Sequence, residues 1–159
     1  MNKSGLLRQM KNGAFNFYWI AGLSIINSLF FFFGKRPGFV IGLGITMSVD
    51  IFAHNIAQSF PNSVLLIKSI GLLLDLLICG MFTICGLLAW KRFRWAFIIG
   101  MVLFGLDAVL TLVSGDVIGF GFHLFFLWFL YVGLRSLDEL NMLDSENERH
   151  PIFPNIPKL

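Results

Sequence analysis

Several side chains that can carry a proton or bind a metal ion lie inside long apolar stretches of this sequence. Five of them are well inside such stretches: Asp50, His54, Asp75, Asp107 and His123. A sixth group, Lys68, lies near the end of one stretch. Carboxylates and imidazoles serve in proton relays and also act as ligands of divalent metal ions. In an apolar segment they are costly to bury and normally find partners, so they indicate where a site should be sought.

The apolar stretches themselves predict helices that cross a membrane. The 159-residue chain is 57% hydrophobic and 13% charged, whereas soluble domains carry about 25% charged residues. The run of four phenylalanines at residues 30–33 would promote aggregation on a soluble surface but is stable against lipid. We therefore expect an all-α integral membrane bundle of about five transmembrane helices with short loops, and a lipid bilayer as its main partner.

Turn residues divide the chain into five predicted spans and a polar tail. The spans cover residues 14–33, 39–57, 64–88, 95–113 and 117–134, within a transmembrane domain of residues 1–136. Residues 1–13 mix basic and apolar side chains, which predicts a short interfacial helix. Residues 137–159 are acidic and then rich in proline, which predicts an aqueous C-terminal tail that is helical at first.

The distribution of Lys and Arg predicts the orientation. With five spans, the N-terminus shares one face with the turns near residues 60 and 115, and the C-terminal tail lies on the other face. The second face carries six basic residues close to the spans: Lys35, Arg36, Lys91, Arg92, Arg94 and Arg135. The positive-inside rule then places the N-terminus outside and the C-terminus inside. If the second segment fails to cross, the N-terminus and loop 91–94 share a side instead.

The net charge of +3 comes largely from these basic residues at the ends of spans. Their placement is typical of charges that set membrane orientation. We therefore expect no nucleic-acid partner for this chain.

The depth and facing of the ionisable groups predict that most of them meet. At a rise of about 1.5 Å per residue, three lie roughly 9–11 Å from the face shared with the N-terminus. These three are Asp50, Asp107 and His123. His54 and Lys68 are shallower, and Asp75 lies near the midplane. Small and polar residues recur at helical spacing on each segment, so we expect a shared pocket near that face.

Three interpretations of this polar layer stay open. It can be structural, with Asp107 bonded to His123, Asp50 bonded to His54, and Lys68 neutralising one carboxylate. It can be a proton or ion relay. It can also hold a divalent metal, the one cofactor that the residue types suggest, although no motif such as HExxH is present. The metal ligands would be Asp50, His54, Asp107 and His123.

Three stretches of the chain together resemble small, uncharacterised multi-pass membrane proteins of bacteria. They are Phe39–Ile45 leading to Asp50, Trp95–Ala108 with its Gly105-Leu106-Asp107 triplet, and His123–Phe125 leading to Gly133 and Leu134. The resemblance covers about half of the chain. It implies a location in the bacterial inner membrane and brings no activity with it.

Three classes of function follow. The first is a non-catalytic accessory or interaction subunit that packs against other membrane proteins or a second copy of itself. The small size and the lack of nucleophile-elbow or phosphate-loop motifs favour this class over an enzyme. The second is an ion, proton or solute transporter that uses the polar layer. The third is a membrane-embedded, metal-assisted enzyme.

Overall fold

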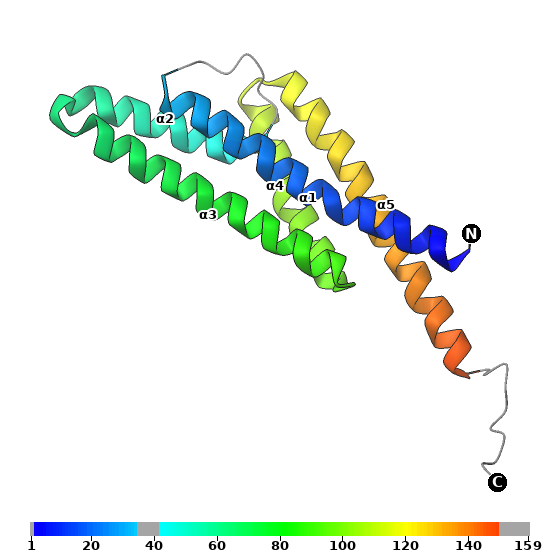
Figure 1. Ribbon diagram of the computed structural model, residues 1–159. Coiled ribbons are helices and arrows are strands. Elements are labelled where there is room, and N and C mark those ends of the chain that lie inside the picture. The colour runs from blue at the N-terminus through cyan, green and yellow to red at the C-terminus, as the bar shows by residue number, and fades with distance from the viewer. Residues whose placement is uncertain (1, 35–41, 150–159) are drawn as a thin grey trace, which may run out of the picture.

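The computed structural model describes residues 2–34 and 42–149, which fold into a bundle of helices (Figure 1). The elements are α1 (Lys3–Phe32), α2 (Gly44–Ser59), a 3-10 turn η1 (Pro61–Ser63), α3 (Val64–Trp90), α4 (Arg94–Val113) and α5 (Val117–Arg149). Among these described elements there is no strand, so the predicted all-α class is confirmed. The helices α1, α3, α4 and α5 are long and apolar enough to cross a membrane.

The fifth helix, α2, is too short to cross on its own. Its 16 residues extend about 24 Å, against a hydrocarbon core of about 30 Å. It begins at Gly44 rather than at residue 39, where the second span was predicted; residues 39–41 lie outside the described part of the chain. Because its first residue is hydrogen-bonded to Asp107, six residues before the last residue of α4, α2 starts inside the bundle and runs to the α2–α3 turn.

The bundle has two ends. End A holds the C-terminus of α1, the α2–α3 turn (60–63) and the α4–α5 turn (114–116); end B holds the N-terminus of α1, the α3–α4 turn (91–93) and the C-terminal part of α5 (Figure 1). At end B, Lys3 and Arg92 form ion pairs with Asp144 at 2.6 and 2.8 Å. In the described residues, the start of α1 and the last part of α5 therefore lie at the same end of the bundle. The five-span prediction placed these two parts of the chain at opposite ends, because it counted residues 39–57 as a complete span.

At end B, α1 and α5 continue past the length that a membrane requires. They have 30 and 33 residues. Leu6 and Met10 of α1 are buried in one apolar cluster with Leu137 and Leu140 of α5. The interfacial helix expected over residues 1–13 is thus the first part of α1. The tail expected from residue 137 is helical through Arg149, and residues 150–159 lie outside the described chain.

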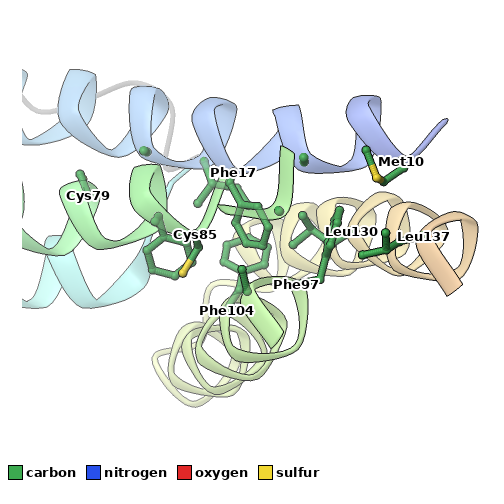
Figure 2. Packing of buried hydrophobic residues seen from close by; sticks show 14 of the residues in the cluster. Met10, Phe17, Cys79, Cys85, Phe97, Phe104, Leu130 and Leu137 are labelled. Carbon is green, nitrogen blue, oxygen red and sulfur yellow. The ribbon is translucent and has the colours of Figure 1, made fainter. Parts of the chain in front are cut away.

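Four phenylalanine rings fill the centre of the bundle, and we call them the Phe cluster. They are Phe17 from α1, Phe82 from α3, and Phe97 and Phe104 from α4. Their neighbouring ring centroids are 6.0–6.4 Å apart, and all four side chains are buried. Figure 2 shows Phe17, Phe97 and Phe104 gathered where α1 crosses α4, with Leu130 and Leu137 continuing the core along α5. The interior is therefore densely apolar between the two ends.

Candidate functional site

Asp107 of α4 caps the N-terminus of α2 from a different helix. Its Oδ2 accepts a hydrogen bond from the Gly44 N–H and its Oδ1 accepts one from the Ile45 N–H, both at 2.8 Å. The Leu43 N–H donates to the Ser24 hydroxyl of α1 at 2.7 Å. The first N–H groups of a helix have no partner within it, and each unsatisfied group in a bilayer costs several kcal/mol. These contacts explain how a helix can begin inside the bundle.

Close contact between α2 and α4 depends on the glycine at position 44. A Cβ there would lie 2.5 Å from the Thr111 Oγ1, closer than real Cβ atoms approach. Gly44 and Ser48 are spaced four apart, as small residues at helix contacts often are. In the structure Gly44 packs against α4 within the chain, and both Gly44 and Ser48 line a cavity.

His123 of α5 completes this arrangement. Its Nε2 lies 2.8 Å from the Asp107 Oδ2 and its Nδ1 lies 2.7 Å from the Gly119 carbonyl oxygen. Which ring nitrogen donates depends on the tautomer, and only an imidazolium carries an N–H on each nitrogen. The Asp107–His123 pair expected from the sequence is thus present.

Asp50 and Asp75 form a second, separate cluster. The carboxyl group of Asp50 on α2 lies within interaction range of Asp75 on α3, and both lie within range of the Ser28 hydroxyl on α1. Neither Asp75 oxygen nor the Ser28 Oγ has a hydrogen-bond partner of normal geometry within residues 2–34 and 42–149. Along α2, Asp50 is about 9 Å from Gly44. The polar layer expected as one pocket is therefore divided into two clusters.

The observed helix lengths explain why Asp75 joins Asp50. Because α2 continues to Ser59, Asp50 lies about 14 Å from the α2–α3 turn, and Asp75 lies about 17 Å from the same turn. The sequence prediction ended the second span at residue 57. It therefore placed Asp50 only about 11 Å from the membrane face and left Asp75 deeper than the other ionisable groups. The two helices form an antiparallel pair, so groups at equal distances from their turn face each other.

A cavity of about 540 Å³ lies between α1, α2 and α4 and reaches end A. Polar side chains on its wall include Asn27, Thr46, Ser48, Asp50, Thr111 and Ser114. Asp50 brings the acidic cluster to this wall, whereas Asp75 lies behind it. The Phe cluster is not part of the lining, and it fills the interior on the end B side.

His54 and Lys68 line the outer part of this cavity. The His54 Nε2 lies 3.1 Å from the Gln58 Nε2, and its ring contacts Phe31 with 5.8 Å between ring centroids. Among the described residues no hydrogen bond joins His54 to Asp50, and Lys68 forms no ion pair. The expected Asp50–His54 pair and the expected neutralisation by Lys68 are therefore not seen.

The metal hypothesis finds no support in the described part of the chain, because no three His, Cys, Asp or Glu side chains there are grouped to hold an ion. Of the four ligands expected from the sequence, Asp107 and His123 lie in one cluster, Asp50 lies in the other, and His54 lies on the outer part of the cavity wall. Asp107 and His123 already direct their polar atoms at each other and at backbone groups.

Sequence reasoning missed that the backbone at the start of α2 is part of the site. The available signal was Gly42-Leu43-Gly44, where two glycines interrupt an apolar run. The position of Ser28 beside two carboxyl groups was not predicted either.

Comparisons with protein-family models, with curated proteins and with solved structures find no match. The geometry of the two clusters and of the cavity is therefore the basis for any function assigned to the chain.

Proposed function

We propose that this chain is a non-catalytic membrane protein that binds a small polar solute in the cavity at end A. The observation that carries this proposal is a polar-lined space of about 540 Å³ inside an otherwise apolar bundle. That volume is typical of small-molecule sites. Polar groups at membrane depth are tolerated where they line a water-filled or ligand-filled cavity.

The state of the Asp107–His123 pair supports binding rather than catalysis. A general base must reach the proton it removes, directly or through one water. Both ring nitrogens of His123 are already hydrogen-bonded, and the residue does not line the cavity. The pair serves as part of the framework that positions α2, whose first turns form one wall of the cavity.

The cavity is blind in this conformation, which favours binding over conduction. Phe17, Phe82 and Phe104 are packed together between it and end B. A solute that crossed the membrane would have to displace these rings. Another membrane protein, or a second copy of this chain, is the partner that would make use of the bound solute.

The charge distribution supports a location for each end. Basic residues gather at end B, where Lys3, Arg92 and Arg94 form ion pairs with α5 and Lys11 lies 5.3 Å above the Trp90 ring. By the positive-inside rule, end B faces the cytoplasm and the cavity opens on the opposite side. Together with the resemblance described above, this arrangement supports the inner membrane of a bacterium.

Thiol labelling tests whether the cavity is open to water. In a background with Cys79 and Cys85 replaced by Ala, Ser48→Cys places a thiol on the cavity wall. A membrane-impermeant reagent added to the extracytoplasmic side should label it. The matched control is Val109→Cys, on the exposed apolar surface of α4, which lipid should protect. Labelling of Ser48→Cys only after denaturation would contradict the proposal.

A further inference from the structure

The burial of Asp75 without hydrogen-bond partners requires a physical explanation. The residue is 1% exposed and Asp50 is 8% exposed. The Ser28 hydroxyl beside them is also buried and unpartnered in the described chain. Asp50 lies on the cavity wall, and the Asp75 and Ser28 side chains lie within interaction range of it without lining the cavity themselves.

Two carboxylates in such a place cannot both stay ionised without compensation. At close range in a low-dielectric site, like charges strongly disfavour double ionisation, and burial disfavours each charge further. Either a proton or a cation must therefore be held between them. Oxygen atoms from carboxylates and hydroxyls are the ligands that hard cations prefer.

We propose that Asp50, Asp75 and Ser28 form a site for one monovalent cation of the size of Na⁺, which enters from end A and replaces a proton shared by the two carboxyl groups. This inference rests on the proposed function and names its solute. A divalent ion fits less well, because Ca²⁺ takes about 6–8 oxygen ligands and Mg²⁺ about six. Two carboxyl groups and one hydroxyl supply fewer than either needs.

The exchange leaves the net charge of the site unchanged. A carboxyl O–H bond breaks, the proton passes to water in the cavity, and the cation takes its place among the freed carboxylate oxygens and the hydroxyl. One positive charge leaves as one enters. The site therefore avoids the large cost of burying additional net charge.

The charged and titratable groups around this pair are placed elsewhere. His54 and Lys68 lie nearer end A on the cavity wall, and Asp116 lies at its mouth. On the opposite side Cys79 is buried one turn along α3, within electrostatic range of Asp75. Asp107 and His123 are hydrogen-bonded to each other in the other cluster. Within residues 2–34 and 42–149, none of these groups forms an ion pair with Asp50 or Asp75. In the proposed site, the compensating cation comes from solution.

Proton release tests the exchange directly. The purified full-length protein is placed in weakly buffered nanodiscs with a pH-indicator dye, and NaCl or choline chloride is added at equal ionic strength. NaCl should release up to one proton per chain, and choline chloride should release none. NaCl should also raise the unfolding temperature, more at pH 8 than at pH 6. Because protons compete with the cation, the apparent affinity of the protein for Na⁺ should fall up to tenfold for each unit by which the pH is lowered.

Two variants separate the site from the rest of the cavity. Asp75→Asn keeps the shape of the side chain but removes one of the two carboxyl groups that share the proton and hold the cation, so both responses to NaCl should disappear. The matched control is Glu146→Gln, a loss of one carboxyl group on the exposed surface of α5 away from the cavity, and both responses should persist. If Asp75→Asn does not fold, the comparison of NaCl with choline chloride in the native protein still tests whether sodium displaces a proton.

Three results would overturn the proposal. The first is an equal response to NaCl and to choline chloride. The second is a sodium response that persists in folded Asp75→Asn. The third is proton titration of the Asp50–Asp75 pair that sodium does not change. Labelling of Ser48→Cys distinguishes the two proposals. If that thiol is accessible while sodium has no effect, the solute-binding cavity stands and the cation is wrong.

Discussion

Asp107 shows how one carboxylate can replace the cap that a helix normally builds from its own sequence. Leu43, at the N-cap position of α2, has no side-chain hydrogen bond to offer. Asp107 instead accepts two backbone N–H groups of α2 and contacts His123. A negative charge is also favoured at the positive end of a helix dipole. One residue therefore fixes the position of α2 relative to both α4 and α5.

Replacing Asp107 by Asn should destabilise the protein. An amide has a single acceptor oxygen, so one of the two N–H groups of α2 would lose its partner. We expect a loss of about 1–3 kcal/mol, the usual cost of an unsatisfied buried group. Thermal unfolding in detergent measures this loss. The exposed change Glu146→Gln on α5 is the control and should leave the midpoint unchanged. Equal midpoints for both variants would show that α2 does not need this cap.

At the scale of helices, facing was predictable from the sequence and helix starts were not. Helical spacing correctly assigned Asp50, Asp107 and His123 to inward faces, and all three are buried. Side-chain direction follows the helical period wherever a helix forms. The start of α2 depends instead on Asp107, which lies 62 residues from Ile45 in the chain. No local window of hydropathy contains that interaction, so the segment was predicted to be a full span.

The contact between α1 and α5 depends on two glycines that face each other. A Cβ built on Gly13 would lie 2.5 Å from the Gly133 Cα, so the two backbones touch. Small residues permit such approach between helices in membranes. The Gln9 and Ser136 side chains are hydrogen-bonded beside this contact at 2.9 Å. The contact thus sets the spacing of the two longest helices.

Gly13→Ala should force these helices apart. Overpacking of this kind costs about 1–3 kcal/mol, and the clash is with backbone, which cannot rotate away. Gly22→Ala is the matched control on the same helix, because a Cβ there meets nothing within 4 Å. It should be neutral or slightly stabilising, since Gly costs about 0.5–1 kcal/mol in a helix. The comparison uses thermal unfolding of both variants. A Gly13→Ala midpoint at or above that of Gly22→Ala would contradict the close contact.

At the scale of the whole molecule, Asp144 joins three distant parts of the chain at end B. Lys3 begins α1, Arg92 lies in the α3–α4 turn, and Asp144 lies in the last part of α5. The hydrogen bonds from Lys3 and then from Arg92 hold the pKa of Asp144 below its ordinary value of 3.8. The folded state therefore favours the charged form of this carboxyl group.

This lowered pKa predicts a pH dependence of stability. The pKa is lower in the folded than in the unfolded chain, so the stabilisation is complete above the unfolded value of about 4. It is lost as the pH falls through the lower folded value. Asp144→Asn should therefore lower the unfolding midpoint at pH 6, and its difference from the native chain should shrink below pH 4. Glu148→Gln, an exposed change on the same helix, is the control. A difference that stays constant from pH 6 to pH 3 would count against these ion pairs.

The number of complete crossings determines which parts of the chain share a side of the membrane. With five crossings, the N-terminus and the α2–α3 turn would be on the same side. With four crossings, the N-terminus and the α2–α3 turn are on opposite sides. The N-terminus then lies on the same side as the end of α5, as the contacts of Asp144 require. Single cysteines at exposed positions distinguish these topologies: Ser4→Cys at end B, Asn141→Cys on α5, and Asn62→Cys in η1.

In intact bacterial cells that express these variants without Cys79 and Cys85, an impermeant thiol reagent should label Asn62→Cys. Ser4→Cys and Asn141→Cys should react only after the membrane is permeabilised, because end B is expected to face the cytoplasm. Labelling of all three positions after permeabilisation is the control for thiol reactivity. If Ser4→Cys and Asn62→Cys were labelled from the same side, α2 would have to cross the membrane completely. Its start could then not lie beside Asp107, and the cavity that depends on that start would not exist.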